Sequence, residues 1–355
     1  MSLRRLLHPL NRRLETTVHP LRYLFIEITQ RCNLKCLHCG SDCSARPMPG
    51  ELTTEEWLRF FGHLARDGPV DRMVLVITGG EPLCHPELER ILAGLRELGL
   101  TWGMVTNGHA LSSARVDQLV RAGISSITVS LDGLEASHDW LRGVPGAFQR
   151  ATAGLRRLAG QDLPLFDVVT CVNPRNLDEL PQLLELLREL GVPAWRLFSI
   201  FPRGRARENR ELMLSPVQFR RMLGFIADER LELAREDFSL SFSCEGYLPP
   251  DLDGKVRDEL YFCRAGISIG SVLCDGSISA CPNIPRSLVQ GNIRTDDLLQ
   301  VWQERFEPFR QRSWMQRGPC EGCHEWSRCL GNSMHLWDEE AGQTACCTYR
   351  MATGD

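Results

Sequence analysis

The run Cys32-Asn33-Leu34-Lys35-Cys36-Leu37-His38-Cys39 places three thiols at a CxxxCxxC spacing. It comes directly after a short apolar run, residues 23–29, that has the composition of a strand. Cysteines at this spacing can point their sulfurs at one centre from a tight loop. Three close thiolates are typical ligands of an iron–sulfur cluster or of zinc.

The number of ligands alone does not decide between these metals. A structural zinc site has four ligands, as has an electron-transfer cluster, and Cys43 is near enough in sequence to be the fourth. The position of the loop favours a cluster, because it follows the first strand of a βα series, where barrels carry their chemistry. A cluster held by three cysteines leaves one iron open to a substrate-like molecule.

Short apolar runs alternate with helical patterns from Tyr23 to about Leu240. Strands are predicted at residues 23–29, 73–78, 101–106, 126–131, 165–172, 195–200 and 238–243. Helices are predicted at 53–66, 86–98, 112–121, 146–159, 176–190 and 215–233. This alternation predicts parallel strands joined by right-handed crossovers. About six such units predict an α/β fold with a partial (β/α)6 barrel.

The loop and the βα series together resemble the radical S-adenosylmethionine (SAM) superfamily. The resemblance implies that Cys32, Cys36 and Cys39 hold a 4Fe–4S cluster as metal ligands and catalytic residues. In that family the fourth iron is chelated by the amino and carboxylate groups of SAM. One electron from the cluster then splits SAM into methionine and a 5′-deoxyadenosyl radical.

A second motif, Thr78-Gly79-Gly80-Glu81-Pro82, follows the second predicted strand. It matches the GGE motif of the family, so the resemblance implies that Gly79, Gly80 and Glu81 hold the amino group of SAM. Two glycines also let the backbone approach a ligand closely. The alternative is a Gly-Gly turn before a helix that begins at proline.

Four further residues are candidates for binding SAM. Asn107 and Ser130 end the third and fourth predicted strands, on the rim where barrels bind ligands. The resemblance assigns Ser130 to the ribose or carboxylate of SAM. Arg142 is a candidate carboxylate partner, with a solvated arginine as the alternative. Arg205 lies in a loop similar to the PxGRA loop of the family and is expected to face SAM, with a simple basic loop as the alternative.

The last part of the chain is dense in cysteine. Its spacing resembles the SPASM domain, an extension of radical SAM enzymes that modify peptides and proteins and that binds auxiliary iron–sulfur clusters. The resemblance implies one or two such clusters, and their candidate ligands are Cys263, Cys281, Cys320, Cys323, Cys329, Cys346 and Cys347.

One position departs from the SPASM pattern, because Ser333 stands where the family has a cysteine. The array of Cys320, Cys323 and Cys329 needs a late cysteine to complete it, and Cys347 is weakly favoured over Cys346. The array of Cys263 and Cys281 lacks its further ligand. Cys274, Cys244 or the spare thiol of the terminal pair are substitutes, so a rearranged cluster, a 2Fe–2S cluster or no cluster are all open there.

Composition excludes several classes of protein. The chain has 355 residues and a net charge of −4, which gives no sign of nucleic-acid binding. No apolar run approaches the ~20 residues that a membrane span needs. Fifteen cysteines, an odd number clustered at short gaps, favour metal sites in a reducing compartment, so a cytoplasmic location is expected.

Four segments are expected along the chain. Residues 1–21 form an N-terminal extension, an amphipathic helix expected to cover the bottom of the barrel rather than to touch a membrane or partner. Residues 22–243 form the barrel, 244–260 a linker, and 261–355 the SPASM domain, with a helix at 295–311.

These motifs predict an enzyme in which the radical abstracts hydrogen from a carbon of the substrate. A ribosomal peptide or protein side chain is the leading substrate, with a separate recognition protein as a possible partner. A small molecule or a tetrapyrrole side chain is the alternative, and a non-catalytic metal-binding scaffold is a third class. The expected electron donor is a flavodoxin or ferredoxin.

Overall fold

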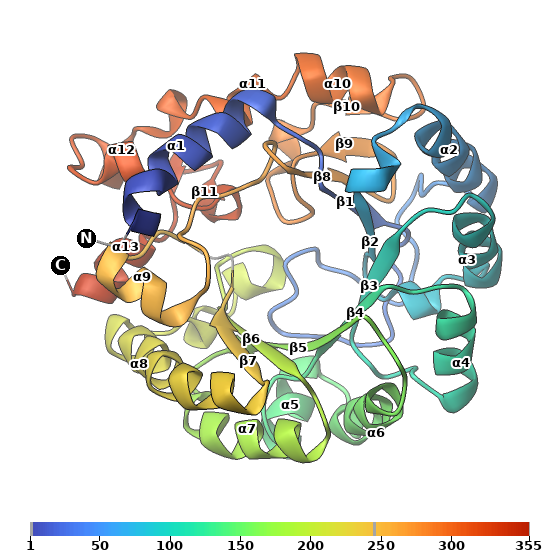
Figure 1. Cartoon of the computed structure of the whole chain (residues 1–355), viewed down its shortest axis with the longest axis horizontal. Helices are drawn as coiled ribbons and strands as arrows, with labels where there is room; N and C mark the ends of the chain where they lie inside the picture. The colour runs from blue at the N-terminus through green and yellow to red at the C-terminus, as the bar shows by residue number, and fades with distance from the viewer. Residues whose placement is uncertain (1–2, 244–245, 355) are drawn as a thin grey trace.

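The computed structural model describes residues 3–243 and 246–354, so Cys244 lies outside the described residues. A curved parallel sheet forms the body of the molecule (Figure 1). Its strands agree closely with the predicted ones: β1 (Tyr23–Glu27), β2 (Val74–Thr78), β3 (Trp102–Thr106), β4 (Ser126–Ser130), β5 (Leu165–Val172), β6 (Ala194–Ser199) and β7 (Ser239–Phe242).

Helices cover the outer face of this sheet (Figure 1). They are α2 (Thr54–Asp67), α3 (Leu88–Glu97), α4 (Ser113–Arg121), α6 (Ala147–Ala159), α7 (Leu180–Glu189) and α8 (Pro216–Leu233). Thr53 caps α2 with a capping box to Glu56, as the spacing of these two residues suggests. A further helix that the sequence did not reveal, α5 (Glu135–Arg142), lies between β4 and α6.

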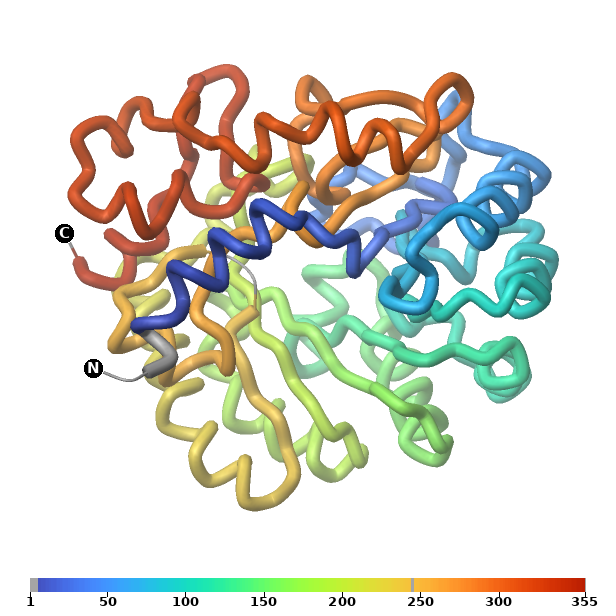
Figure 2. The backbone as a smooth tube through the Cα atoms, turned by 45° about the horizontal axis from the view of Figure 1, so that its top comes forward, coloured from blue at the N-terminus to red at the C-terminus, as the bar shows by residue number. Residues whose placement is uncertain are grey.

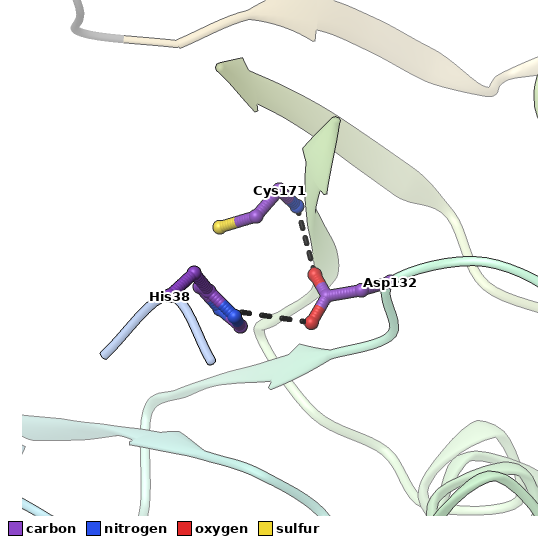
Figure 3. A group of neighbouring side chains, drawn as sticks. All are labelled: His38, Asp132 and Cys171. Carbon is purple, nitrogen blue, oxygen red and sulfur yellow. Dashed lines mark hydrogen bonds and ion pairs between the residues drawn. The ribbon is translucent and has the colours of Figure 1, made fainter. Parts of the chain in front are cut away.

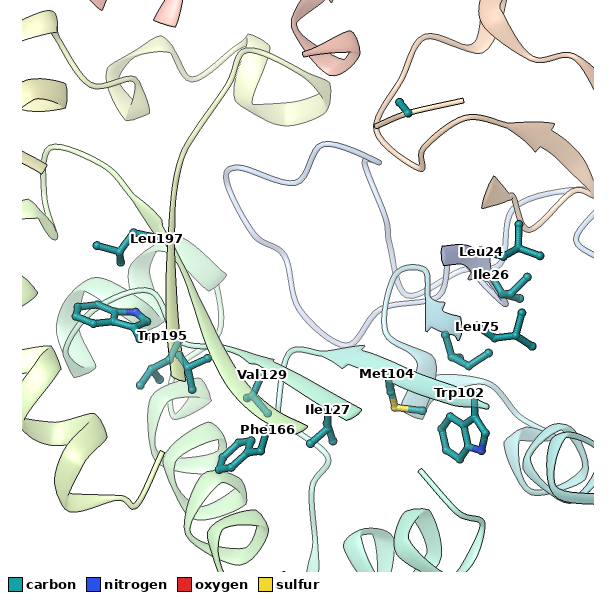
Figure 4. Packing of buried hydrophobic residues seen from close by; sticks show 14 of the residues in the cluster. Leu24, Ile26, Leu75, Trp102, Met104, Ile127, Val129, Phe166, Trp195 and Leu197 are labelled. Atoms are coloured by element: carbon teal, nitrogen blue, oxygen red, sulfur yellow. The ribbon is translucent and has the colours of Figure 1, made fainter. Parts of the chain in front are cut away.

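The hydrophobic core lies between the sheet and the helices (Figure 4). Alternate residues of each strand, such as Leu24 and Ile26 of β1, are fully buried against helix side chains such as Trp57. Because successive side chains point to opposite faces, the remaining residues of each strand line the inside of the barrel. Those inner positions are where polar groups are available for a ligand.

The sheet continues into the C-terminal region. Strand β8 (Ile269–Val272) pairs in parallel with β1, with Tyr23 opposite Ile269. Strands β9 (Ser277–Ser279) and β10 (Gly291–Asn292) extend the sheet with antiparallel pairing. The described chain therefore has one ten-stranded sheet, and the expected boundary after residue 260 does not separate it from the barrel.

One prediction for the second half of the chain was wrong. The single helix predicted at 295–311 is two helices, α10 (Leu298–Glu304) and α11 (Glu307–Arg310), because Pro308 has no N–H to donate to the Glu304 carbonyl and so cannot continue α10. The segment predicted as a linker contains the short helix α9 (Pro250–Val256), which begins at a proline. The remaining elements are short: α12 (Trp326–Cys329), β11 (Trp337–Asp338), β12 (Gln343–Thr344) and α13 (Thr348–Thr353).

Helix α1 (Leu3–Val18) lies beside the C-terminal region rather than only against the barrel (Figure 2). The Arg12 guanidinium donates to the backbone oxygens of Ser327 and Arg328 at 2.8 and 2.7 Å. The Trp302 indole donates to the backbone oxygen of His19 at 2.9 Å. Helix α1 and the residue that follows it therefore attach the N-terminal segment to the C-terminal region. In the described part of the protein, no helix is both long and apolar enough to cross a membrane.

Candidate functional site

The cysteine loop follows β1 at the carboxyl end of the strands, and its neighbours hold its backbone in place. Lys35 and Leu37 donate their N–H groups to the last carbonyls of α5, at Arg142 and Leu141, at 3.0 and 2.8 Å. The N–H of Arg205 donates to the Cys39 oxygen at 3.0 Å. Helix α5, which was not predicted, thus shapes the predicted loop.

The loop sulfurs do not form a compact group of the kind that holds one zinc ion. Zinc–sulfur bonds of about 2.3 Å would bring the sulfurs of a tetrahedral site to roughly 4 Å from one another. Within residues 3–243 and 246–354, the only three ligand-type side chains with atoms all within 4.8 Å of one another are His38, Asp132 and Cys171. The sulfurs of Cys32, Cys36 and Cys39 are therefore too far apart for a single zinc ion.

Each loop sulfur has at least one N–H donor. The backbone N–H of Leu34 lies 3.5 Å from Cys32 Sγ, and Nδ2 of Asn107 lies 3.8 Å from it. A guanidinium nitrogen of Arg142 lies 3.6 Å from Cys36 Sγ, and the Cys43 N–H lies 3.4 Å from Cys39 Sγ. Such donors stabilise thiolates and tune clusters, so the surroundings fit the expected group.

Cys43 supports the loop from a buried position. Its thiol donates a hydrogen bond to the Cys39 sulfur, which lowers the pKa of Cys39 and raises that of Cys43. Three ligands, Cys32, Cys36 and Cys39, stay the prediction that the family resemblance implies.

His38 of the cysteine loop lies beside the buried Asp132 and the half-buried Cys171 (Figure 3). Asp132 Oδ2 is 2.6 Å from an Arg142 nitrogen and 3.9 Å from His38 Nε2, and Asp132 Oδ1 accepts from the Cys171 N–H at 2.8 Å. Burial would raise the pKa of Asp132, but the nearby charges, Arg142 first, outweigh it and lower that pKa. The guanidinium already supplies the positive charge, so this group is an ion-pair network rather than a metal site.

Arg142 is buried and paired with Asp132, so it is not the solvated arginine that the sequence left as the alternative. Its side chain is buried between Asp132 and Cys36, and its Nε has no hydrogen-bond acceptor among the described residues. That free N–H leaves room for the expected contact with the carboxylate of SAM, which remains a prediction. The sequence did not point to His38 or Cys171, because nothing local marks their proximity.

The GGE turn packs its backbone against the start of the cysteine loop. The N–H groups of Gly80 and Glu81 donate to the oxygens of Thr29 and Arg31, both at 2.8 Å. Gly79 has a φ of +137°, and a Cβ there would lie 2.1 Å from the Thr29 oxygen. A Cβ on Gly80 would lie 2.4 Å from the Arg31 oxygen. Both glycines are thus needed for this close approach, whatever they bind.

Glu81 is fully buried below this turn. Its Oε1 accepts from the Leu83 N–H at 3.1 Å and from the Thr106 hydroxyl at 2.8 Å, and its Oε2 accepts from the Asn107 N–H at 2.7 Å. Burial raises the pKa of Glu81 although these bonds oppose the shift. A carboxylate has about four acceptor positions, so one remains for an ammonium group.

The other SAM candidates lie around the same rim. Ser130 ends β4 and is half-buried. Its hydroxyl makes no hydrogen bond with another residue in the described part of the chain. Arg205 bonds to the loop itself: its Nε donates to the Cys36 oxygen at 2.8 Å, and its terminal nitrogen reaches Asp42 and the Cys43 oxygen. Arg205 therefore shapes the loop, and a direct contact with SAM stays a prediction.

The late cysteines divide between two places. A cavity of about 320 Å³ is lined by Cys320, Cys323, Cys329 and Cys347. Cys346 lines a different cavity, and its sulfur lies 3.0 Å from the Met351 sulfur. Four thiols around one cavity fit an auxiliary cluster and favour Cys347 over Cys346.

The second array is less complete. Ser333 is fully buried and bonded to the Tyr261 hydroxyl, so it does not present a free oxygen in the way a ligand would. Cys274 is bonded through its N–H to Glu27 at 3.3 Å, and its sulfur lies 3.9 Å from that of Met48. Cys263 is buried and Cys281 half-buried. No further ligand for these two cysteines is evident within the described residues.

Comparison with known proteins defines the class. The chain matches the model of the radical SAM superfamily over residues 26–187 and that of SPASM, an iron–sulfur cluster-binding domain, over residues 263–324. The chain belongs to the radical SAM superfamily and carries a C-terminal SPASM domain. It is therefore an enzyme with a 4Fe–4S cluster, SAM and auxiliary iron–sulfur clusters as cofactors.

Particular relatives share most of its length. The chain is 31% identical to the AdoMet-dependent heme synthase of Methanosarcina barkeri over 333 residues, covering 87% of this chain and 90% of that protein. It is 28% identical to the Fe-coproporphyrin III synthase of the same organism, covering 78% and 72%. The solved structure of anSMEcpe with bound AdoMet shares the fold, with a TM-score of 0.70, 18% identity and 90% of each chain covered.

Bound at this site, the cluster and SAM supply a radical that removes a hydrogen atom from a substrate. The described residues contribute the surroundings for that chemistry. Burial raises the pKa of Cys32 and Cys36, and the N–H donors around their sulfurs oppose that shift. The GGE turn closes one side of the loop, and Arg142 brings a positive charge next to Cys36.

Proposed function

We propose that this enzyme modifies a side chain of an iron tetrapyrrole. The observation that carries the proposal is the 31% identity to an AdoMet-dependent heme synthase, which extends over 90% of that protein. The Fe-coproporphyrin III synthase adds a second relative with a tetrapyrrole in its name. These relatives support the tetrapyrrole alternative over the ribosomal peptide that the SPASM pattern first suggested.

Similarity to solved structures does not favour a peptide as the substrate. The anSMEcpe structure is only 18% identical to this chain, and at that level the similarity concerns the fold. Related folds carry many substrates, so the substrate has to be argued from closer relatives and from the site.

In this proposal Cys32, Cys36 and Cys39 hold the cluster, and Gly79, Gly80 and Glu81 hold the amino group of SAM. Asn107, Ser130, Arg142 and Arg205 surround the same rim. Cys320, Cys323, Cys329 and Cys347 hold one auxiliary cluster. Loss of a hydrogen atom leaves the substrate with an unpaired electron, and an auxiliary cluster can accept that electron when the product forms. A flavodoxin or ferredoxin supplies the electron that starts each turnover.

The test is a turnover assay with reconstituted enzyme under anaerobic conditions. Iron coproporphyrin III, SAM and a reductant are supplied, and mass spectrometry follows the tetrapyrrole while chromatography measures 5′-deoxyadenosine. We expect a change in tetrapyrrole mass in proportion to 5′-deoxyadenosine. The matched control is the Cys32→Ala, Cys36→Ala, Cys39→Ala variant, which should form neither product. SAM cleavage that leaves every iron tetrapyrrole offered unchanged would contradict the proposal.

A further inference from the structure

A cavity of about 360 Å³ lies between the loop after β6 and the C-terminal region. Apolar side chains, among them Ile200, Phe201, Met213 and Leu336, form much of its wall, and Arg207 and Arg210 lie at its edge. A site of this size and composition is typical of small-molecule binding.

A second cavity, of about 210 Å³, adjoins the first. The two share Arg207, His335 and Leu336, and the second is also lined by Arg203 and by Gly40, the residue after Cys39. Gly204 lies so close that a Cβ on it would be 2.3 Å from the Cys39 oxygen. The paired cavities therefore reach from the C-terminal region to the cysteine loop.

Flat rings line the place where the cavities meet. The rings of Phe201 and His335 lie 4.3 Å apart, centre to centre, at an angle of 38°. Burial lowers the pKa of His335 to about 3, with a smaller effect from Arg203, so the imidazole is neutral near pH 7. The two rings pack against each other, and together with Ile200 and Leu336 they form an uncharged wall of the first cavity.

The acidic residues around the cavities already have partners. Both oxygens of Glu340 accept from Arg207, at 2.8 and 2.6 Å. Asp338 Oδ1 accepts from the backbone N–H groups of Glu340 and Ala341, at 3.0 and 3.1 Å. Glu339 accepts from Ser287. The negative charge of this region is therefore taken up by contacts within the protein.

Two arginines that line the cavities, Arg203 and Arg210, lack such partners among the described residues. The guanidinium groups of Arg203 and Arg210 make no hydrogen bond or ion pair with any other residue in the described part of the chain, although both line the cavities. Burial lowers the pKa of Arg203, because its charge is partly removed from water. Within residues 3–243 and 246–354, the cavities therefore hold two guanidinium groups without a partner, beside the unpartnered Nε2 of the neutral His335.

We propose that the paired cavities bind the carboxylate side chains and one face of the iron tetrapyrrole. Arg203 and Arg210 donate to two carboxylates, since guanidinium and carboxylate match in geometry and charge. Phe201 and His335 lie against the macrocycle. This inference rests on the proposed function and adds where and by which residues the substrate is held.

The test measures binding without turnover. Iron coproporphyrin III is titrated into reconstituted enzyme without SAM or reductant, and the Soret absorbance gives the dissociation constant. We expect Arg203→Gln and Arg210→Gln each to weaken binding about tenfold, the effect of losing one charge-assisted bond. The matched control is Arg235→Gln, an exposed arginine whose hydrogen bonds go only to Glu232. Thermal unfolding of each variant confirms that the fold is kept.

A ligand with esterified carboxylates separates charge from packing. We expect it to bind wild type and both variants with the same lower affinity. Equal affinity of wild type, Arg203→Gln and Arg210→Gln for iron coproporphyrin III, in an enzyme that turns over a tetrapyrrole, would overturn this inference and leave the proposed function intact. Absence of tetrapyrrole binding and turnover in the wild type would overturn both.

Discussion

Arg142 shows how one buried side chain connects the network to the cluster loop. It lies 2.6 Å from Asp132 and 3.6 Å from Cys36 Sγ, and it is 7% exposed. A positive charge and an N–H donor next to a ligand sulfur stabilise the more negative, reduced cluster. We therefore expect Arg142→Gln to make the midpoint potential of the SAM-binding cluster more negative, measured by redox titration followed by EPR.

Arg196→Gln is the control for this experiment. Arg196 is also an arginine of the barrel paired with an aspartate, Asp167, but its hydrogen bonds involve no residue of the cysteine loop. Its replacement should leave the potential unchanged. The same potential in wild type and Arg142→Gln would show that the contact with Cys36 has no electronic effect.

Glu81 is the second residue with a direct test. Its carboxylate accepts three hydrogen bonds, and the family resemblance predicts that it also accepts one from the ammonium group of SAM. We expect Glu81→Gln to weaken SAM binding by roughly ten- to a hundredfold, the cost of one bond to a charged group. Equilibrium dialysis measures the affinity. Since the new amide would also face the donors of Thr106 and Asn107, the unfolding temperature is measured too; a lower temperature with unchanged SAM affinity would make Glu81 purely structural.

Among the elements, the GGE turn is the one whose shape depends most on its glycines. Gly79→Ala places a Cβ 2.1 Å from the Thr29 oxygen at a φ of +137°. We expect a loss of about 1–3 kcal/mol or more in the free energy of unfolding. Urea unfolding of the apoprotein measures it.

Gly62→Ala is the matched control for the turn. Gly62 lies inside α2, and a Cβ there meets nothing within 4 Å. Alanine is favoured over glycine in a helix by about 1 kcal/mol, so this variant should be slightly more stable than wild type. A Gly79→Ala protein as stable as wild type would mean that the turn can move away from Thr29.

The segment that leads into α13 provides the second test at the scale of an element. Cys347 lines the cavity with Cys320, Cys323 and Cys329, whereas Cys346 lies against Met351. We expect Cys347→Ser to lose about four irons per chain, the content of one cubane cluster. Cys346→Ser should keep them. Iron analysis after reconstitution decides, and the opposite result would reverse the assignment.

How far the sequence predicts the elements depends on the range of the interactions that make them. The capping box at Thr53 and the alternation of the strands are local patterns, and they located most of the barrel within a few residues. Helix α5 was not predicted, because it has only eight residues and its buried face consists mostly of the polar residues Ser137, His138 and Arg142. The break before α11 was missed, although Pro308 marks it.

The same reasoning applies to the site. The CxxxCxxC and GGE motifs are contiguous, so the sequence alone located them. The contacts of Arg142 with Asp132 and Cys36, and the cavities around Arg203 and Arg210, arise from segments far apart in the chain. No local pattern encodes such contacts, and the structure was needed to find them.

At the scale of the whole molecule, the continuous sheet makes the C-terminal region part of the barrel. Strand β8 pairs along its full length with β1, the strand that leads into the cysteine loop. A chain ending at residue 260 would leave β1 as an unpaired edge, which promotes association. We expect that truncated chain to form higher oligomers in size-exclusion chromatography.

A chain ending at residue 293 is the comparison for this truncation. It keeps β8, β9 and β10 and therefore the pairing with β1. It should contain more monomer than the shorter chain at equal concentration. Equal oligomer content in the two chains would show that pairing with β8 does not protect β1.

The pairing of Tyr23 with Ile269 also has a consequence for biosynthesis. The first strand leaves the ribosome early, but its neighbour on one side is translated only after the other barrel strands. Until then that side of the nascent sheet has no partner, and contacts so distant in sequence form slowly. We therefore expect this open edge to be a binding site for a chaperone until Ile269–Val272 has been translated.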